Sequence, residues 1–419
     1  MDVTKACAGL LLTISVACGA VAAEHDHAAM APSADSPCQD STQPASLRCG
    51  LTPSSVFDSR GRLWLVWVQG GHVYLNRSDD RGRTFSAPVA VNRTPEKIAA
   101  HGENRPKIAL GPEGQLYVSW TQTLEKRFTG HIRFARSLDG GRSFDAPLTV
   151  NDDHAEIGHR FESLVVDDAG RIFLAWLDKR DQAAAQRSGK PYRGAALYYA
   201  WSDDAGRSFK ANRKLRDSSC ECCRIVSAVD PDGNPAFLWR HVFGDNIRDH
   251  ALVTFAGPEQ PGETVRVTFD EWQVDACPHH GPALAIDAQG IYHMAWYNNA
   301  AQRHGLFYAF SRDAGRTLSE PMSFGNYAAA AGHPSVLARD GRVYLLWQEF
   351  DGAATHLKLM QSSEGGRQWS PARDVAHADG EVDYPFLVAD AMRVYAAWQT
   401  HADGYRLIPL DEAAHASRP

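Results

Sequence analysis

The sequence predicts an all-β fold, a β-propeller of four-stranded blades, with seven blades favoured and six as the alternative. Three observations support this prediction. Apolar strands that end in tryptophan recur at intervals of 51 to 63 residues, the size of one propeller blade. A turn motif built on Ser, Asp and Gly occurs five times. Each tryptophan strand also lies between shorter apolar segments that we expect to pair with it.

The tryptophan strands set the expected number of blades. There are seven, at 61–67, 114–120, 170–176, 233–239, 290–296, 341–347 and 392–398, ending in Trp67, Trp120, Trp176, Trp239, Trp296, Trp347 and Trp398. One per blade predicts a single propeller over residues 45–419. The last repeat stops at "YRLIPL", one strand short. We expect "ASLRCG", before Leu51, to supply that strand and close the ring, because closure removes exposed sheet edges.

The turn motif has the pattern S-x-D-x-G-x-[ST]-aromatic, and its copies begin at Ser78, Ser137, Ser202, Ser311 and Ser362. The pattern predicts a hairpin turn in which Asp accepts backbone N–H bonds and Gly adopts a positive φ. Blade four lacks a copy, and the last two copies depart from the pattern at Leu318, Glu364 and Gln368. The motif resembles the Asp-box (BNR) repeat of sialidase-like propellers. The resemblance implies that these boxes are structural turns and not catalytic elements.

The amino terminus predicts export. Residues 1–23 combine Lys5, an apolar stretch and small residues, the pattern of a cleaved signal peptide. The stretch is too short and too rich in small residues for a membrane-spanning helix; lipidation of Cys18 is the alternative to cleavage. We therefore expect a periplasmic or secreted protein, in a compartment where disulfides can form. The net charge of −7 argues against a general nucleic-acid binder, and we expect a monomer.

Residues 24–44 are polar and rich in Pro, Ser and Ala, which predicts a flexible tether. If cleavage leaves a terminus beginning "AEH", the amine, two amides and His25 form a square-planar set suited to Cu(II) or Ni(II). His27 adds a ligand. The alternative is an ordinary solvated tail.

Residues with metal-binding or catalytic chemistry gather before the expected inner strands. Consecutive strands of a blade alternate in direction, so these positions share one rim of the central channel, opposite the boxes. Pockets favour such channel mouths. The residues are His101, Arg105, His159, Arg160, Glu162, Arg224, Cys277, His279, His280, His333, Asp383 and Tyr384. The alternative is a set of scattered polar loop residues.

The cysteines allow two main interpretations. Six remain after the signal: Cys38, Cys49, Cys220, Cys222, Cys223 and Cys277. If Cys38 bonds Cys49, the least strained pairing of the others is Cys220 with Cys223 and Cys222 with Cys277. Alternatively the thiolates bind zinc or Cu(I) together with imidazoles. The candidate ligands are then Cys220, Cys222, Cys223, Cys277, His279 and His280, with His101, His159 and His333 nearby. A catalytic thiol, with His279 or His280 as its base, is a third possibility.

The resemblance to sialidases implies a carboxylate clamp of three arginines, a tyrosine nucleophile activated by Glu, and an Asp acid/base. The family's first blade carries Arg-Ile-Pro, whereas this chain has "LTPSSVF" there, and Arg105-Pro106 comes one blade later. Arginines at the rim are candidates for an anion clamp: Arg105, Arg160, Arg224, Arg240 and Arg248. Tyr384, with Glu162 or Glu381, is the candidate nucleophile pair.

The segments "CECC", "WRHVFGDNIRDH" and "CPHHGPAL" together resemble an exported bacterial subgroup of sialidase-like repeat proteins. Three functional hypotheses follow. The first is binding of a copper or zinc ion at the channel mouth, with a role in periplasmic copper handling. The second is an exo-sialidase-like hydrolase or glycan-binding protein, and the third is a disulfide-braced scaffold for a protein partner.

Overall fold

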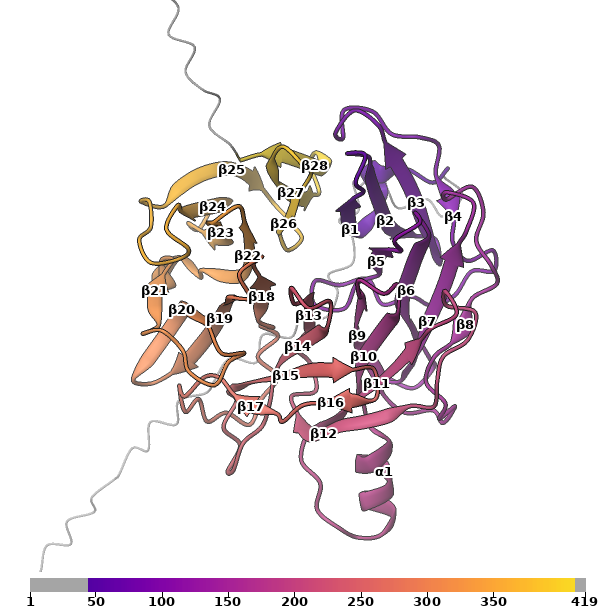
Figure 1. Ribbon diagram of the computed structural model, residues 1–419, viewed down its shortest axis with the longest axis horizontal. Coiled ribbons are helices and arrows are strands. Elements are labelled where there is room, and N and C mark those ends of the chain that lie inside the picture. The colour runs from indigo at the N-terminus through magenta and orange to yellow at the C-terminus, as the bar shows by residue number, and fades with distance from the viewer. Residues whose placement is uncertain (1–43, 411–419) are drawn as a thin grey trace, which may run out of the picture.

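The computed structural model describes residues 44–410, in which seven β-sheets are arranged as blades around a central axis (Figure 1). The prediction of a seven-bladed propeller is therefore confirmed. The expected signal peptide and, except for Pro44, the tether of residues 24–44 lie outside the described residues. So do the predicted ligands His25 and His27, and Cys38.

The first three blades each have four antiparallel strands. Blade one contains β1 (Leu51–Phe57), β2 (Leu63–Gln69), β3 (His72–Ser78) and β4 (Val89–Ala90). Blade two contains β5 (Lys107–Leu110), β6 (Leu116–Thr123), β7 (Gly130–Ser137) and β8 (Leu148–Thr149). Blade three contains β9 (His159–Val166), β10 (Ile172–Asp178), β11 (Ala195–Ser202) and β12 (Arg213–Ser219), with helix α1 (Arg180–Arg187) between β10 and β11.

The remaining blades differ at their outer edges. Blade four contains β13 (Val226–Val229), β14 (Pro235–Arg240), β15 (His250–Gly257) and two short strands that both pair with β15, β16 (Gln260–Pro261) and β17 (Val265–Arg266). Blade five contains β18 (Ala283–Ile286), β19 (Tyr292–Ala300), β20 (Arg303–Ser311) and β21 (Met322–Phe324); the short helix η2 (Tyr327–Ala329) follows. Blade six contains β22 (Gly332–Arg339), β23 (Arg342–Phe350), β24 (Ala354–Ser362) and β25 (Arg373–Asp379). Blade seven contains β26 (Phe386–Ala389), β27 (Val394–Thr400) and β28 (Gly404–Pro409).

The segment before β1 does not form the fourth strand expected for blade seven. It forms a 3-10 helix, η1 (Leu47–Cys49), that lies against β28. The helix uses its backbone groups internally, since Cys49 N donates to Ser46 O at 2.9 Å and Gly50 N donates to Leu47 O at 3.3 Å. These groups are therefore not available for a strand ladder, and the ring closes by packing of η1 and β1 against blade seven.

The seven predicted tryptophans all lie in the second strand of a blade and are at most 2% exposed. Each second strand is covered on both sides by neighbouring blades, which explains its nearly continuous apolar sequence. Six of the seven indole N–H groups donate to an acceptor among the described residues. Trp239, in blade four, has no hydrogen-bond partner among the described residues.

The Asp boxes form the expected turns between the third and fourth strands. In the second box, Asp139 Oδ1 accepts from Ser143 N at 3.0 Å and from Ser137 Oγ at 2.8 Å. Asp139 Oδ2 accepts from Ser143 Oγ at 2.6 Å, and Gly140 and Gly141 both have positive φ. These bonds explain why the motif needs Asp, Gly and a hydroxyl at fixed spacing.

The strand order places two kinds of loop on opposite faces. Because consecutive strands are antiparallel, the boxes lie at the ends where inner strands finish. The segments before the inner strands lie on the other face, together with α1. This helix, which the sequence did not predict, projects from blade three at the lower edge of Figure 1.

Candidate metal centre at the channel mouth

The segment "CECC" forms a tight turn between β12 and β13, shortly before the inner strand of blade four begins. Cys220, Cys222 and Cys223 are 1%, 4% and 2% exposed and pack in one apolar cluster with Phe161 and Trp239. The main chain anchors the turn, because Cys220 N donates to Arg240 O at 3.0 Å. The turn is thus a buried part of the blade three to blade four connection.

Helix α1 holds this turn from outside. Glu221, the residue between the first two cysteines, accepts from Lys179 Nζ at 2.9 Å and from Gln182 Nε2 at 3.1 Å. With Glu221 drawn toward the helix, the flanking cysteine side chains lie on the protein interior. A half-buried acidic residue inside the motif therefore helps to fix the direction of the thiols.

The sulfur atoms converge in two overlapping groups. Cys220 Sγ lies 3.8 Å from Cys222 Sγ and 3.8 Å from Cys223 Sγ, and all three sulfurs lie within 4.8 Å of one another. In the second group, Cys222 Sγ, Cys277 Sγ and a ring nitrogen of His279 also lie within 4.8 Å of one another. Cys222 belongs to both groups. We call the first group the inner triad and the second the outer triad.

The four cysteines of these triads are free thiols in the structure. The pairing Cys220–Cys223 and Cys222–Cys277 considered from the sequence is thus not formed. A sulfur separation of 3.8 Å is a non-bonded contact, well beyond the S–S bond length of about 2.05 Å. Cys49 is disulfide-bonded, while its expected partner Cys38 lies outside the described residues.

The protonation of the thiols differs within the inner triad. Hydrogen bonds from Cys222 and Cys223 lower the pKa of Cys220, with a smaller contribution from Arg248 and Arg240. Burial raises the pKa of Cys223. At the outer triad, the hydrogen bond from Cys222 lowers the pKa of Cys277, and Arg160 lies close enough to interact electrostatically with both. Hydrogen bonding to Cys220, Cys223 and Cys277 raises the pKa of Cys222 well above its ordinary value. The thiolate form is therefore favoured at one sulfur of each triad, Cys220 in the inner and Cys277 in the outer.

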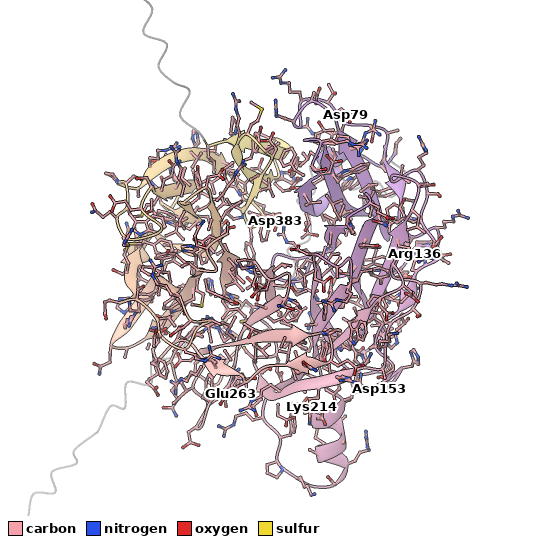
Figure 2. All side chains as sticks on the ribbon, in the orientation of Figure 1. Asp79, Arg136, Asp153, Lys214, Glu263 and Asp383 are labelled. Atoms are coloured by element: carbon pink, nitrogen blue, oxygen red, sulfur yellow. The ribbon has the colours of Figure 1, made fainter. Side chains whose placement is uncertain are left out.

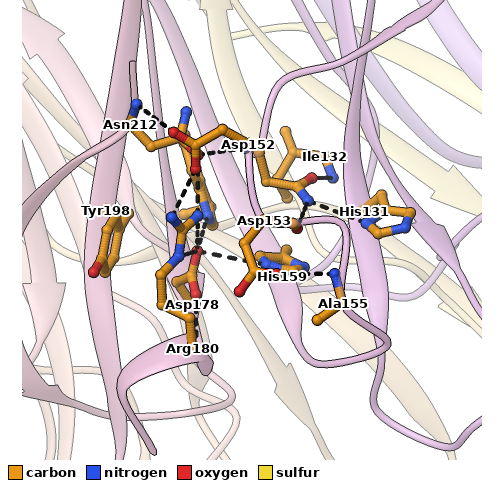
Figure 3. Close-up of polar contacts among 12 residues, drawn as sticks. His131, Ile132, Asp152, Asp153, Ala155, His159, Asp178, Arg180, Tyr198 and Asn212 are labelled. Atoms are coloured by element: carbon orange, nitrogen blue, oxygen red, sulfur yellow. Dashed lines mark hydrogen bonds and ion pairs between the residues drawn. The ribbon is translucent and has the colours of Figure 1, made fainter. Parts of the chain in front are cut away.

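The remaining predicted metal ligands are not members of either triad, although His101 lies close enough to His279 to interact with it electrostatically. His101 is exposed and lies beside Arg160, whose Nη2 is 3.4 Å from His101 Nε2. His159 is buried in a different network (Figure 3): its Nδ1 is 2.8 Å from Gly130 O, and its Nε2 is 3.7 Å from Asp178 Oδ2. Asp178 also accepts from Trp176 Nε1 and pairs with Arg180. His159 therefore serves the packing of blade three, and the prediction that it lies near the thiols is not met.

His280 and His333 form part of a column of stacked rings. His280 stacks on Tyr297 with ring centroids 4.0 Å apart, and His333 stacks on Tyr384 at 3.4 Å. The two imidazoles are 4.6 Å apart. Burial lowers the pKa of both histidines, and the column links blades five, six and seven. Neither ring belongs to a thiol group.

Glu103 is the main residue of the mouth that sequence reasoning missed. It is 2% exposed and accepts from Arg224 N, Arg224 Nη1 and Gly281 N at 2.9, 2.9 and 3.0 Å. A Cβ at position 281 would approach the Glu103 carboxylate to 2.6 Å, so the site requires glycine there. The available signal was its position in "HGENRP", between His101 and Arg105.

The predicted anion clamp does not have free guanidinium groups at its centre. Arg105 donates to Gly102 O, Pro53 O and Asp383 Oδ1. Arg224 donates to Glu103 and to the carbonyls of Pro282 and Pro334. Arg240 donates to the carbonyls of Arg248, His280 and Tyr297. These three side chains hold neighbouring blades together.

The other catalytic candidates are also engaged within the protein. Glu162 is 1% exposed and accepts from Thr121 Oγ1 at 2.8 Å, and burial raises its pKa. Burial likewise raises the pKa of Tyr384, which disfavours a phenolate nucleophile. Arg248 donates from Nε to Val274 O at 3.2 Å.

A cavity of about 280 Å³ lies along the axis, lined by inner-strand residues of all seven blades.

Comparison with known proteins agrees with the fold. Residues 164–395, more than half of the chain, match the family described as a BNR repeat-like domain. The chain belongs to this BNR repeat-like family. No curated protein matches this BNR repeat-like chain. None of its described helices is long and apolar enough to cross a membrane.

Solved structures with a similar fold include proteins that act on or bind carbohydrates. An ulvan lyase of a new polysaccharide lyase family has a TM-score of 0.55 and 12% identity, covering 86% of this chain and 93% of the lyase. A lectin from Burkholderia pseudomallei has a TM-score of 0.54 and 10% identity, covering 86% and 99%. A microbial sialidase has a TM-score of 0.49 and 16% identity, covering 84% and 76%. At these identities the likeness to the lyase and the lectin shows a shared propeller fold and nothing more.

Proposed function

We propose that this propeller binds a thiophilic metal ion, copper(I) or zinc, at its channel mouth through Cys220, Cys222, Cys223, Cys277 and His279. The observation that carries the proposal is the convergence of four sulfurs and one imidazole from two segments more than 50 residues apart in sequence. If the protein is exported, as its amino terminus predicts, and the ion is copper, the role would be copper handling in the periplasm.

The spacing of the sulfurs fits metal coordination. A tetrahedral zinc site with Zn–S bonds of about 2.3 Å has its sulfurs about 3.8 Å apart. Cys220 Sγ lies at this distance, 3.8 Å, from both Cys222 Sγ and Cys223 Sγ. Thiolates select zinc and Cu(I) over hard cations, and Arg160, Arg240 and Arg248 offset the negative charge of buried thiolates.

The experiment is metal analysis of protein prepared with and without reductant. Anaerobic, reduced protein should bind Zn(II) or Cu(I) in competition with a chromophoric chelator, and Cys220→Ser or Cys223→Ser should weaken binding about 100-fold or more. Ser219→Ala is the matched control, because Ser219 is equally buried, adjacent in sequence and its hydroxyl has no partner among the described residues. It should leave the affinity unchanged.

Thiol counting decides between the metal and disulfide hypotheses. If protein isolated from the periplasm has these four cysteines fully oxidised, and reduced protein binds neither ion, the proposal is wrong and the disulfide-braced scaffold replaces it. A catalytic thiol is less well supported, because three of the four sulfurs are at most 4% exposed.

A glycan-directed function has weaker support from this site. Its favourable observation is the similarity in fold to an ulvan lyase and a lectin. However, Arg105, Arg224 and Arg240 donate to protein carbonyls and carboxylates, so they are not free to bind a substrate carboxylate. We expect no cleavage of a fluorogenic sialoside by the folded protein.

A further inference from the structure

We infer that the channel mouth holds two metal ions, most naturally Cu(I), bridged by the thiolate of Cys222. This inference rests on the proposed function and deepens it. The two triads share one sulfur, but they do not merge into a single group within 4.8 Å. The five donors therefore do not surround one common position. They surround two positions, one in each triad, and each position can hold one ion.

The number of donors fits two three-coordinate ions. Two such ions need six metal–ligand bonds, and the five donor atoms supply six when Cys222 Sγ contributes one bond to each ion. Thiolates commonly bridge Cu(I) in this way, and Cu(I) is stable with three soft ligands. Two four-coordinate zinc ions would need eight bonds, so two would have to come from other groups. The donor count thus favours Cu(I).

The local charge also fits a pair of monovalent ions. Four thiolates, one neutral imidazole and two Cu(I) ions carry a net charge of −2. Arg160 interacts with Cys222 and Cys277 at the outer triad, and Arg240 and Arg248 interact with Cys220 at the inner triad. Guanidinium charge therefore acts on sulfurs of both triads.

The two positions differ in access to solvent. The inner triad is buried, whereas in the outer triad Cys277 is exposed and His279 is partly exposed. An ion at the outer position is therefore open to exchange with a chelator or a partner protein. An ion at the inner position is shielded from such exchange because all three of its ligands are buried. The shared sulfur of Cys222 provides a route between the two positions by stepwise ligand exchange, with no change in oxidation state.

The test is the stoichiometry of Cu(I) binding to reduced, full-length mature protein under anaerobic conditions, measured by native mass spectrometry and by chelator competition. Wild-type protein should bind two ions, and the chelator should remove one of them at least tenfold faster than the other. X-ray absorption should show a Cu–Cu scattering path in the doubly loaded protein.

Variants assign the ions to the triads. Cys277→Ser and His279→Ala should each retain one slowly exchanging ion, and Cys223→Ser should retain one fast-exchanging ion. Cys222→Ser should bind neither ion tightly. The control Ser219→Ala should have the same melting temperature as the wild type and should still bind two ions. Circular dichroism identifies any variant that fails to fold, and Cys277→Ser at the exposed position provides the least disruptive test.

The outcomes separate the two proposals. One ion in wild type, lost equally in Cys223→Ser and Cys277→Ser, would overturn the two-ion cluster but leave the proposed function intact. No bound ion in wild type would overturn both. Two ions that both persist in Cys222→Ser would exclude Cys222 as the bridge.

Discussion

Glu103 shows how one buried carboxylate organises the channel mouth. It comes from the loop before blade two, yet it binds the main chain of Arg224 and Gly281 and the guanidinium of Arg224. Its environment lowers its pKa, because the charge of Arg224 and hydrogen bonds, including one with His333, outweigh desolvation. The ionised carboxylate therefore stabilises the fold and positions the turns that carry both halves of the thiol site.

Glu103→Gln should destabilise the protein by about 3–5 kcal/mol at pH 7, because it leaves Arg224 buried without its counter-charge. Since the pKa of Glu103 is lowered on folding, its contribution is present above the unfolded value near 4.3 and is lost as the pH falls below it. Between pH 5 and pH 3 the wild type should lose more stability than Glu103→Gln. Urea unfolding at each pH measures this difference.

Glu263→Gln, at an exposed position, is the control for the removal of one negative charge. It should follow the wild type at every pH. Parallel pH profiles for wild type and Glu103→Gln would contradict a native-state role for the ionised carboxylate.

At the scale of elements, the tryptophan strands are alike in burial but not in hydrogen bonding. Trp67 Nε1 donates to Asn76 Oδ1 at 2.6 Å, and Asn76 is itself 3% exposed. Trp239, whose strand packs against the thiol turn, lacks a partner among the described residues. Blade four also lacks an Asp box, so it departs from the repeat in both respects.

Trp67→Phe should cost about 1–3 kcal/mol more stability than Trp239→Phe. Both lose similar packing, but only Trp67→Phe leaves a buried amide oxygen without its donor. Chemical unfolding of the two variants measures the difference, and equal costs would show that the Trp67–Asn76 bond contributes nothing net.

The Asp boxes allow the opposite faces of the propeller to be tested separately. Asp139→Ala should cost about 1 kcal/mol, since the hydrogen bonds it removes are charge-assisted but exposed to water. Metal stoichiometry and affinity should be unchanged, because the box lies on the face opposite the thiol triads. A loss of metal binding in this variant without loss of fold would contradict that separation.

At the scale of the whole molecule, Arg105 joins the first and last blades of the ring. From the loop before β5 it donates to Pro53 O in blade one at 2.9 Å and to Asp383 Oδ1, before blade seven, at 2.6 Å. Figure 2 shows Asp383 near the centre of the ring. Since blade seven has three strands in the described part of the chain, this buried pair contributes to the contact between the first and last blades.

Arg105→Lys should lower the stability by about 3 kcal/mol, because an ammonium cannot reproduce the forked bonds to two blades and leaves Asp383 poorly paired. Arg187→Lys, at an exposed position of α1, should have no effect. Differential scanning calorimetry measures both. An unchanged melting temperature for Arg105→Lys would show that closure depends on packing of η1 and β1 alone.

The sequence by itself determined the architecture and the chemical types at the mouth. Blade number, the tryptophan strands and the Asp boxes could be predicted because each depends on residues close together in the chain, and their periodicity repeats seven or five times. The antiparallel order of the strands also placed "CECC" and "CPHHGP" on one rim. The 3-10 helix η1 was missed because its internal capping and the disulfide of Cys49 compete with strand pairing.

Only the tertiary structure decided which of the rim residues meet. Cys277 and His279 reach Cys222, whereas His159 turns to Asp178 and His333 stacks on Tyr384. Arg105, Arg224 and Arg240, which in sequence resemble an anion clamp, bind carbonyls of neighbouring blades. The physical reason is that a buried polar group must find a partner, and the partners here lie up to several blades away in sequence. A local sequence pattern does not specify which residues from distant blades come into contact. The candidate ligands could therefore be identified from the sequence, whereas their grouping could not.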